Sequence, residues 1–240
     1  MTFLILSDIH ANQEALHAVL EDASGQYDRI VCLGDLVDYG AEPNEAVAWA
    51  KRNVWGIIRG NHDKVSLSDD PLDNYHPAAR ASAEWTRKTL TPESRAYLES
   101  LPRGPLRIEN FEIVHGSPMD EDEYLFAPAD ATEALESISA QVTFFGHTHV
   151  QGGFLVTRSG SKMLAAPGTL EIEPDHFYLI NPGAVGQPRD GDPRAAYAIY
   201  HPERRLVEYR RAAYDIAGAA AKIRRAGLPE GLAARLFLGT

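Results

Sequence analysis

Histidine, aspartate and asparagine side chains gather in five short clusters within the first 150 residues of this 240-residue chain. The clusters are Asp8-Ile9-His10, Gly34-Asp35, Gly60-Asn61-His62-Asp63, His115-Gly116 and Gly146-His147-Thr148-His149. Each cluster follows a segment whose residues favour a β-strand. Because the carboxyl ends of parallel strands border one crevice, we expect these clusters to converge on a single site although they are far apart in the chain.

Convergence would bring together two carboxylates, one amide oxygen and four imidazoles. Such a mixed set suits manganese, iron, zinc, nickel or cobalt better than magnesium or calcium, which prefer shells made only of oxygen. Asp8 and His10 are two residues apart, so on an extended chain they point to the same side and could bind one ion together. The same spacing would let His147 and His149 share an ion. One cluster alone is weak evidence, because Gly-Asp is usually a turn, but all five in order predict a dinuclear metal site.

Alternating strands and helices must position the first three clusters. Phe3 to Leu6 is a continuous apolar run typical of a strand buried on both faces, and residues 12–23 carry apolar side chains at helical spacing. The pattern repeats with a strand at 29–33, a helix at 43–52 that has proline in its first turn, and a strand at 54–58. This βαβαβ order predicts a parallel sheet.

A helical excursion is expected at about 66–104. It contains one helix from Pro77 and a second that begins at Pro92, after the N-cap residue Thr91. The elements expected next are strands within 106–114 with a turn at Glu109-Asn110, a helix at 129–138 and a strand at 142–145.

The C-terminal part at 150–211 predicts short strands in antiparallel structure, followed by a helix at about 216–226. The expected strands lie at 153–158, 162–165, 177–180, 195–200 and 205–210. No repeat or linker-like stretch interrupts the sequence. We therefore expect residues 1–240 to form one domain of stacked sheets with helices outside.

Composition narrows the function classes. The chain is 44% apolar and 24% charged, with 23 Lys and Arg against 34 Asp and Glu, which gives a net charge of −11. It has no Lys/Arg stripe that would release counterions from DNA, so we expect no sequence-independent binding of nucleic acid. Cys32 is the only cysteine, which excludes an intrachain disulfide and a Cys-rich metal cluster.

The sequence also lacks targeting and membrane signals. Residues 1–8 hold five apolar residues without a basic segment, and no apolar run approaches the roughly 20 residues that a bilayer span needs. We expect a cytoplasmic protein with no membrane partner. The sequence leaves the oligomeric state open, a homo-oligomer included.

The ordered clusters resemble the signature of the calcineurin-like metallophosphoesterase family. The matching residues are Asp8-x-His10, Gly34-Asp35-x-x-Asp38, Gly60-Asn61-His62-Asp63, His115-Gly116 and Gly146-His147-x-His149. The later segment at 180–189 is similar to the small prokaryotic, phosphodiesterase-like branch of this family. The resemblance implies an α/β fold, a four-layer αββα sandwich in which helices flank two mixed β-sheets, with two metals at the strand ends.

Carried over residue by residue, the resemblance implies two metal sites that share one ligand. One ion would take Asp8, His10, Asp35 and His149, and the other would take Asp35, Asn61, His115 and His147. Asp35 would bridge the two ions. His62 stays outside both sets and would donate to the phosphate or protonate the leaving oxygen, with Asp38 as its partner. Asn61 and His62 are therefore also expected to contact the substrate.

The activity implied is hydrolysis of small phosphodiesters by attack of a metal-bound hydroxide. Two divalent ions, two carboxylates and one hydroxide leave a charge of about +1, which attracts a phosphoester to an acidic protein. Protein Ser/Thr phosphatases have a phosphate-clamping arginine where this chain has Tyr39, so we expect a diester monoanion to fit better than a monoester dianion. Tyr39 and Arg189 are further candidates for contact with the substrate, and Arg189 could replace the missing charge.

Rival functions stay open. Within enzymes, they are a phosphomonoesterase and a dinucleoside polyphosphate hydrolase. Outside enzymes, the rival is a non-catalytic interaction scaffold on the same fold, which keeps the ligands and loses the catalytic histidine. His62 is present, so the sequence favours catalysis.

Overall fold

The computed structural model describes residues 1–73, 75–157, 159–166 and 168–240, and their strands form two six-stranded mixed sheets. The first sheet has the order β3-β2-β1-β11-β12-β9. Its strands are β1 (Phe3–Leu6), β2 (Arg29–Cys32), β3 (Gly56–Ile57), β9 (Thr169–Glu171), β11 (Ala195–His201) and β12 (Leu206–Ala212). The second sheet has the order β4-β5-β6-β10-β7-β8. Its strands are β4 (Leu106–Ile108), β5 (Phe111–Ile113), β6 (Val142–Phe144), β7 (Gly152–Thr157), β8 (Gly160–Leu164) and β10 (Phe177–Asn181).

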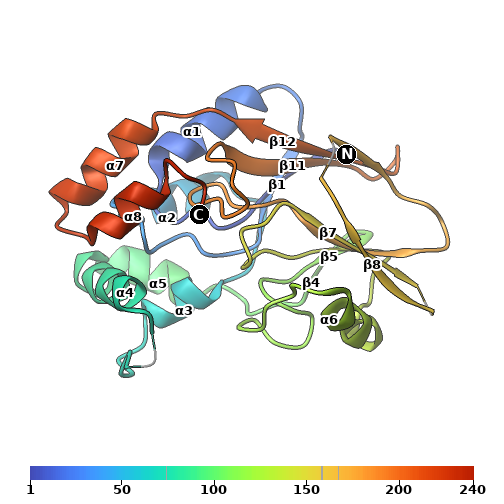
Figure 1. The fold of residues 1–240 in the computed structure, drawn as a ribbon, viewed down its shortest axis with the longest axis horizontal. Helices are drawn as coiled ribbons and strands as arrows, with labels where there is room; N and C mark the ends of the chain where they lie inside the picture. The colour runs from blue at the N-terminus through green and yellow to red at the C-terminus, as the bar shows by residue number, and fades with distance from the viewer. Residues whose placement is uncertain (74, 158, 167) are drawn as a thin grey trace.

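Helices cover the outer faces of both sheets (Figure 1). The helices are α1 (Gln13–Asp22), α2 (Pro43–Asn53), α3 (Asn61–Val65), α4 (Pro77–Thr89), α5 (Pro92–Glu99), α6 (Pro128–Glu133), α7 (Ile216–Arg225) and α8 (Glu230–Arg235). Helix α1 packs on β11 and β12 of the first sheet, whereas α6 packs on β7 and β8 of the second. This arrangement confirms the expected α/β sandwich of two mixed sheets flanked by helices.

Strand β1 explains why the first apolar run of the sequence does not alternate with polar residues. Phe3 and Ile5 pack in the core between the two sheets, while Leu4 and Leu6 pack under the helices on the other face. Successive side chains of a strand point to opposite faces, so a strand buried on both sides must be apolar throughout. The ring of Phe3 meets that of Phe111 from the second sheet edge-on, with centroids 5.0 Å apart.

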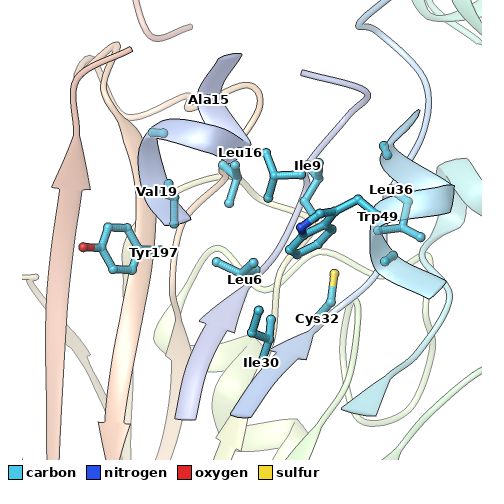
Figure 2. Close-up of a cluster of buried hydrophobic side chains, with 14 of the residues drawn as sticks. Leu6, Ile9, Ala15, Leu16, Val19, Ile30, Cys32, Leu36, Trp49 and Tyr197 are labelled. Carbon is cyan, nitrogen blue, oxygen red and sulfur yellow. The ribbon is translucent and has the colours of Figure 1, made fainter. Parts of the chain in front are cut away.

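The core under the outer helices holds α1 and α2 against the first sheet (Figure 2). Leu16 and Val19 of α1 and Trp49 of α2 point toward the sheet, where they meet Leu6. Cys32 is fully buried in this cluster, and burial raises the pKa of its thiol, so it is a small core residue and not a nucleophile. This packing fixes the ends of β1 and β2, from which the first two chemical clusters begin.

Most of the expected elements are present, with a few differences. Strand β3 has two residues, not five, and the helix expected at 129–138 ends as α6 before a short 3-10 helix at Ala134–Ser137. Helices α3 and α8 and strand β9 were not expected. Residue 158, the last of the strand expected at 153–158, lies outside the described residues. The longest helix of the described part, α4, has 13 residues, and none of its helices is long and apolar enough to cross a bilayer.

Candidate metal centre and active site

The five chemical clusters lie at the carboxyl ends of five strands. Asp8 follows β1, Asp35 follows β2, and Asn61 follows β3, and these three strands run parallel in the first sheet. His115 follows β5 and His147 follows β6, which pair in parallel in the second sheet. The strand ends of both sheets therefore lie at one place, because the carboxyl ends of parallel strands border a single crevice.

The backbone of these loops is left-handed, not extended as expected. Asp8, His10, His147 and His149 have φ angles of 54°, 46°, 66° and 60°. Such conformations cost on the order of 1–3 kcal/mol each for residues other than glycine, so surrounding contacts must hold them. The amides of Asp8 and His10 donate to the carbonyls of Gly34 and Asp35, at 3.1 and 3.0 Å. Hydrogen bonds between loops, and not the extended backbone expected from the sequence, therefore place Asp8 and His10.

The first ligand group consists of Asp8, His10, Asp35 and His149, whose ligand atoms all lie within 4.8 Å of one another. The Nδ1 atoms of His10 and His149 face the carbonyls of Val37 and Gln187, at 2.9 and 2.6 Å. Since a carbonyl only accepts, each Nδ1 carries the hydrogen and each Nε2 is left with a lone pair.

Lone pairs of the first ligand group face one another. The Nε2 atoms of His10 and His149 are 3.2 Å apart, and that of His149 is 3.3 Å from Oδ1 of Asp8. Electron-rich atoms at this spacing repel unless a cation lies among them. The group therefore fits a divalent ion.

The second ligand group consists of Asp35, His115 and His147, again with ligand atoms within 4.8 Å of one another. The Nδ1 of His115 donates to the carbonyl of Leu33 at 2.8 Å, which turns Nε2 toward Oδ1 of Asn61 at 2.9 Å and Oδ2 of Asp35 at 3.3 Å. Oδ2 of Asp35 is buried and has no hydrogen-bond partner among the described residues. A shared metal ligand would leave such an atom free for a cation.

This geometry corrects one expectation about the last cluster. His147 and His149 do not share a ligand group, because His149 joins the first and His147 the second. The Nε2 of His147 donates to the carbonyl of Asp122 at 3.2 Å, so its Nδ1 remains for an ion. The ring of Tyr124 stacks on His147 with centroids 3.8 Å apart.

Burial keeps three of the five clustered histidines unprotonated. It lowers the pKa of His10 and His149, and that of His147 to about 3, which keeps all three neutral as metal ligands must be. At His115, burial opposes the charge, but the negative charge of Asp35 outweighs it and raises the pKa to about 10. In the metal-free protein, the Nε2 of His115 therefore carries a proton that a metal would replace.

His62 and Asp38 form a pair outside both ligand groups. The Nδ1 of His62 lies 2.6 Å from Oδ2 of Asp38, and both side chains are buried. Oδ1 of Asp38 accepts from the Tyr39 amide at 2.9 Å and from the Ser82 hydroxyl. Burial opposes the charge on His62, but Asp35 and Asp38 outweigh it and raise the pKa of its imidazole. Sequence reasoning missed Ser82, which lies on α4 inside the helical excursion.

Asp63 is a second residue that sequence reasoning assigned no role. Its carboxylate accepts from the amides of Asp35 and Gly60 at 2.9 and 3.0 Å, and from those of Leu36 and Val37 at 2.9 and 3.3 Å. These four bonds join the loop after β2 to the start of α3. The sequence feature that indicates this role is an acidic residue three positions after Gly60, which is the spacing of a capping box.

The two candidates for contact with the substrate lie together at the edge of the site. The guanidinium carbon of Arg189 is 5.6 Å from the centroid of the Tyr39 ring, and that ring is 4.6 Å from His62 and 4.7 Å from His10. Tyr39 itself brings no charge to this edge, as the expected preference for diesters requires. The guanidinium of Arg189 lies beside it, as the expectation that Arg189 replaces the missing charge requires.

Known proteins resemble the chain over its length. A family model described as the calcineurin-like phosphoesterase superfamily domain matches residues 1–205. The uncharacterised protein MJ0912 of Methanocaldococcus jannaschii is 37% identical over 241 residues, which cover 98% of this chain and 97% of that protein. A metallophosphoesterase structure from Sphaerobacter thermophilus is 39% identical with a TM-score of 0.88, covering 100% of this chain and 99% of that chain.

A more distant structure shares the fold. The hypothetical protein PH1004 from Pyrococcus horikoshii OT3 is 19% identical with a TM-score of 0.81, covering 100% of this chain and 98% of that chain. Members of the matched family are phosphoesterases that usually bind divalent metals, which agrees with the two ligand groups. This chain belongs to the calcineurin-like phosphoesterase superfamily.

Proposed function

We propose that this chain hydrolyses small phosphoesters with two divalent transition-metal ions, one in each ligand group, bridged by Asp35. The observation that carries the proposal is the buried Oδ2 of Asp35, which has no hydrogen-bond partner among the described residues and faces histidine nitrogens of both groups. Asn61 would complete the second group through the oxygen that now faces His115. Ions bound there would polarise the phosphate oxygens and activate water.

His62 would act as the general acid toward the leaving oxygen. Asp38 fixes Nδ1 of the imidazole, which leaves Nε2 to exchange a proton with the substrate. The Tyr39 amide and Ser82 hold Asp38 in turn, so the acid is oriented before the substrate binds. Asn61 and His62 would both contact the phosphate.

Two substrate classes have support. Tyr39 in place of an arginine favours small phosphodiesters, which carry one negative charge on the reacting phosphate. Arg189 beside Tyr39 favours the second candidate, phosphomonoesters, because a guanidinium pairs well with a dianion. Turnover of bis(4-nitrophenyl) phosphate and 4-nitrophenyl phosphate with added manganese compares the two classes. Absence of turnover of either in a metal-loaded protein would favour the non-catalytic scaffold.

We also propose that residues 1–240 act as one domain. Both sheets contribute to the second ligand group, since Asp35 comes from the first sheet and His115 from the second. Separation of the sheets would therefore destroy the site. Limited proteolysis that released a folded fragment would contradict this.

A further inference from the structure

A cavity of about 370 Å³ lies beside the metal centre. The side chains that line it include Tyr39, His76, Arg189, Leu232 and Arg235. No acidic side chain is among the described residues that line it. We call this cavity the arginine pocket.

The arginine pocket holds two guanidinium groups that pair with no acidic side chain among the described residues. The Nε of Arg235 donates to the main-chain oxygen of Thr240, the last residue, and Arg189 donates to Oε1 of Gln187 at 2.9 Å. The Nε of Arg189 is buried and has no hydrogen-bond partner in the described part of the chain. Both guanidinium groups line the same cavity, and burial, together with the charge of Arg189, lowers the pKa of Arg235. An anion between them would relieve this repulsion.

The C-terminal part of the chain contributes one side of the pocket. Arg235 ends α8, which lies after residue 205, where the match to the family model ends. Leu232 and Leu236 of this segment pack in one cluster with Tyr39. The amide of Gly191, close to Arg189, donates to the carbonyl of Gly239 at 2.9 Å. The two arginines are therefore held in place by packing on both sides.

Tyr39 relates the pocket to the reaction. Its ring touches the pocket on one side and lies 4.6 Å from the ring of His62 on the other. A general acid must face the leaving group, so a leaving group that extends past His62 and Tyr39 would reach the pocket. We propose that the arginine pocket binds an anionic group on the leaving part of the substrate, so that the enzyme selects phosphoesters whose leaving group carries a carboxylate or a second phosphate. This inference rests on the proposed function for the placement of the reacting phosphate.

Binding of non-hydrolysable probes to the manganese-loaded protein tests the pocket. The probes are phenylphosphonate, 4-carboxyphenylphosphonate and 1,4-phenylenediphosphonate, with Kd measured by calorimetry. We expect the second anionic group to tighten binding by about tenfold or more, the usual worth of a charged hydrogen bond. The carboxylate and phosphonate probes distinguish which anion the pocket prefers.

Two variants of Arg235 test whether the arginine pocket causes the tighter binding of the anionic probes. Arg235→Ala should reduce the advantage of the anionic probes to about one, and Arg235→Gln, which keeps most of the side-chain volume, should do the same. Arg225→Ala removes an equal charge from an exposed position on α7 and should keep the wild-type advantage. Circular dichroism checks that each variant is folded.

Equal affinity of the wild type for all three probes would overturn the inference, as would an advantage retained in both Arg235 variants. Hydrolysis of phenyl phosphate and 4-carboxyphenyl phosphate is measured in parallel. If neither of these monoesters nor bis(4-nitrophenyl) phosphate is hydrolysed while the binding difference persists, the proposed function fails and the anion pocket stands. If both monoesters are hydrolysed at equal kcat/KM and the probes are bound equally, the proposed function stands and the pocket assignment fails.

Discussion

The imidazole of His62 is held by Asp38 through a 2.6 Å contact between Nδ1 and Oδ2, in a buried position beside both ligand groups. The other oxygen of Asp38 accepts from the Tyr39 amide and Ser82, so the carboxylate cannot turn away. Three elements thus meet at one imidazole: the loop after β2, helix α3 and helix α4. This arrangement separates a group that can move a proton from the groups that can hold metal.

Replacing His62 by alanine should lower kcat by about 10²–10⁴-fold, the usual worth of a general acid. The metals should stay bound, because His62 belongs to neither ligand group. Steady-state kinetics and metal analysis of the same preparation check both points. His17→Ala, which removes an exposed histidine from α1, should change neither. Near-normal turnover in His62→Ala would rule out its role as the acid.

The activity should fall as the pH rises through the pKa of His62, and that pKa should lie above the ordinary 6.5. Asp35 and Asp38 stabilise the charged imidazole against the opposing effect of burial, so the proton is retained to higher pH. Asp38→Asn removes one of these charges and should move the falling limb to lower pH. Profiles of kcat/KM against pH for both proteins measure the shift.

The stabilisation that the His62–Asp38 pair gives to the folded protein should also decrease as the pH rises through the pKa of His62. A histidine whose pKa is raised by folding contributes stability that is fully present below its unfolded pKa and is lost as the pH rises through the folded value. Asp38→Asn should therefore destabilise the protein more at pH 6 than at pH 9, measured by urea unfolding. If the falling limb of the kcat/KM profile does not move in Asp38→Asn, the pairing of His62 with Asp38 is contradicted.

Asp35→Asn should release both metals, because one carboxylate serves both ligand groups. The amide keeps the shape of the side chain but carries no charge, so the loss reports on coordination. Elemental analysis after gel filtration measures the metal content. Asp175→Asn, at an exposed position, should keep full content. Two tightly bound equivalents in Asp35→Asn would refute the bridge.

Metal binding should release a proton from His115. Its pKa of about 10 in the metal-free protein means that it is protonated at pH 7, and an imidazole must lose this proton to bind a metal through the same nitrogen. Manganese affinity should therefore increase with pH up to about 10. Calorimetric titration in buffers of different ionisation enthalpy counts the released protons. A count that is the same in His115→Ala would show that the proton comes from elsewhere.

The sequence predicted that the candidate ligands converge, because each combines a chemically distinctive side chain with a strand end, and strand ends of parallel sheets meet. It also predicted local features that depend on adjacent residues. Thr91, for example, caps α5 by accepting from the Ser94 amide at 3.2 Å. The apolar run at β1 was recognisable because both faces of that strand are buried.

Features that depend on distant contacts were not predictable in the same way. The left-handed backbone at Asp8 and His10 follows from hydrogen bonds to a loop 25 or 26 residues away. Asp63 acts on amides 26 to 28 residues earlier in the chain. Helix α8 and strand β9 have six and three residues, too few for a periodic pattern, so tertiary packing decides them.

Substrate preference depends on how Tyr39 and Arg189 share the edge of the site. Tyr39 brings no charge to the phosphate, so we predict that aryl phosphodiesters are hydrolysed at higher kcat/KM than the matching monoesters when manganese is supplied. Tyr39→Arg should narrow or reverse this ratio, because a second guanidinium would favour the dianion. The ratio of the two kcat/KM values is the measurement.

Replacing Arg189 tests whether the enzyme prefers phosphomonoesters, because the guanidinium carbon of Arg189 lies 5.6 Å from the Tyr39 ring. If the diester assignment holds, Arg189→Ala should widen the ratio in favour of diesters, since the remaining cation near the phosphate is removed. Arg225→Ala, with the same change in net charge at an exposed position, should leave the ratio unchanged. A wild-type preference for monoesters that disappears in Arg189→Ala would identify Arg189 as the phosphate clamp and reassign the enzyme to monoester dianions.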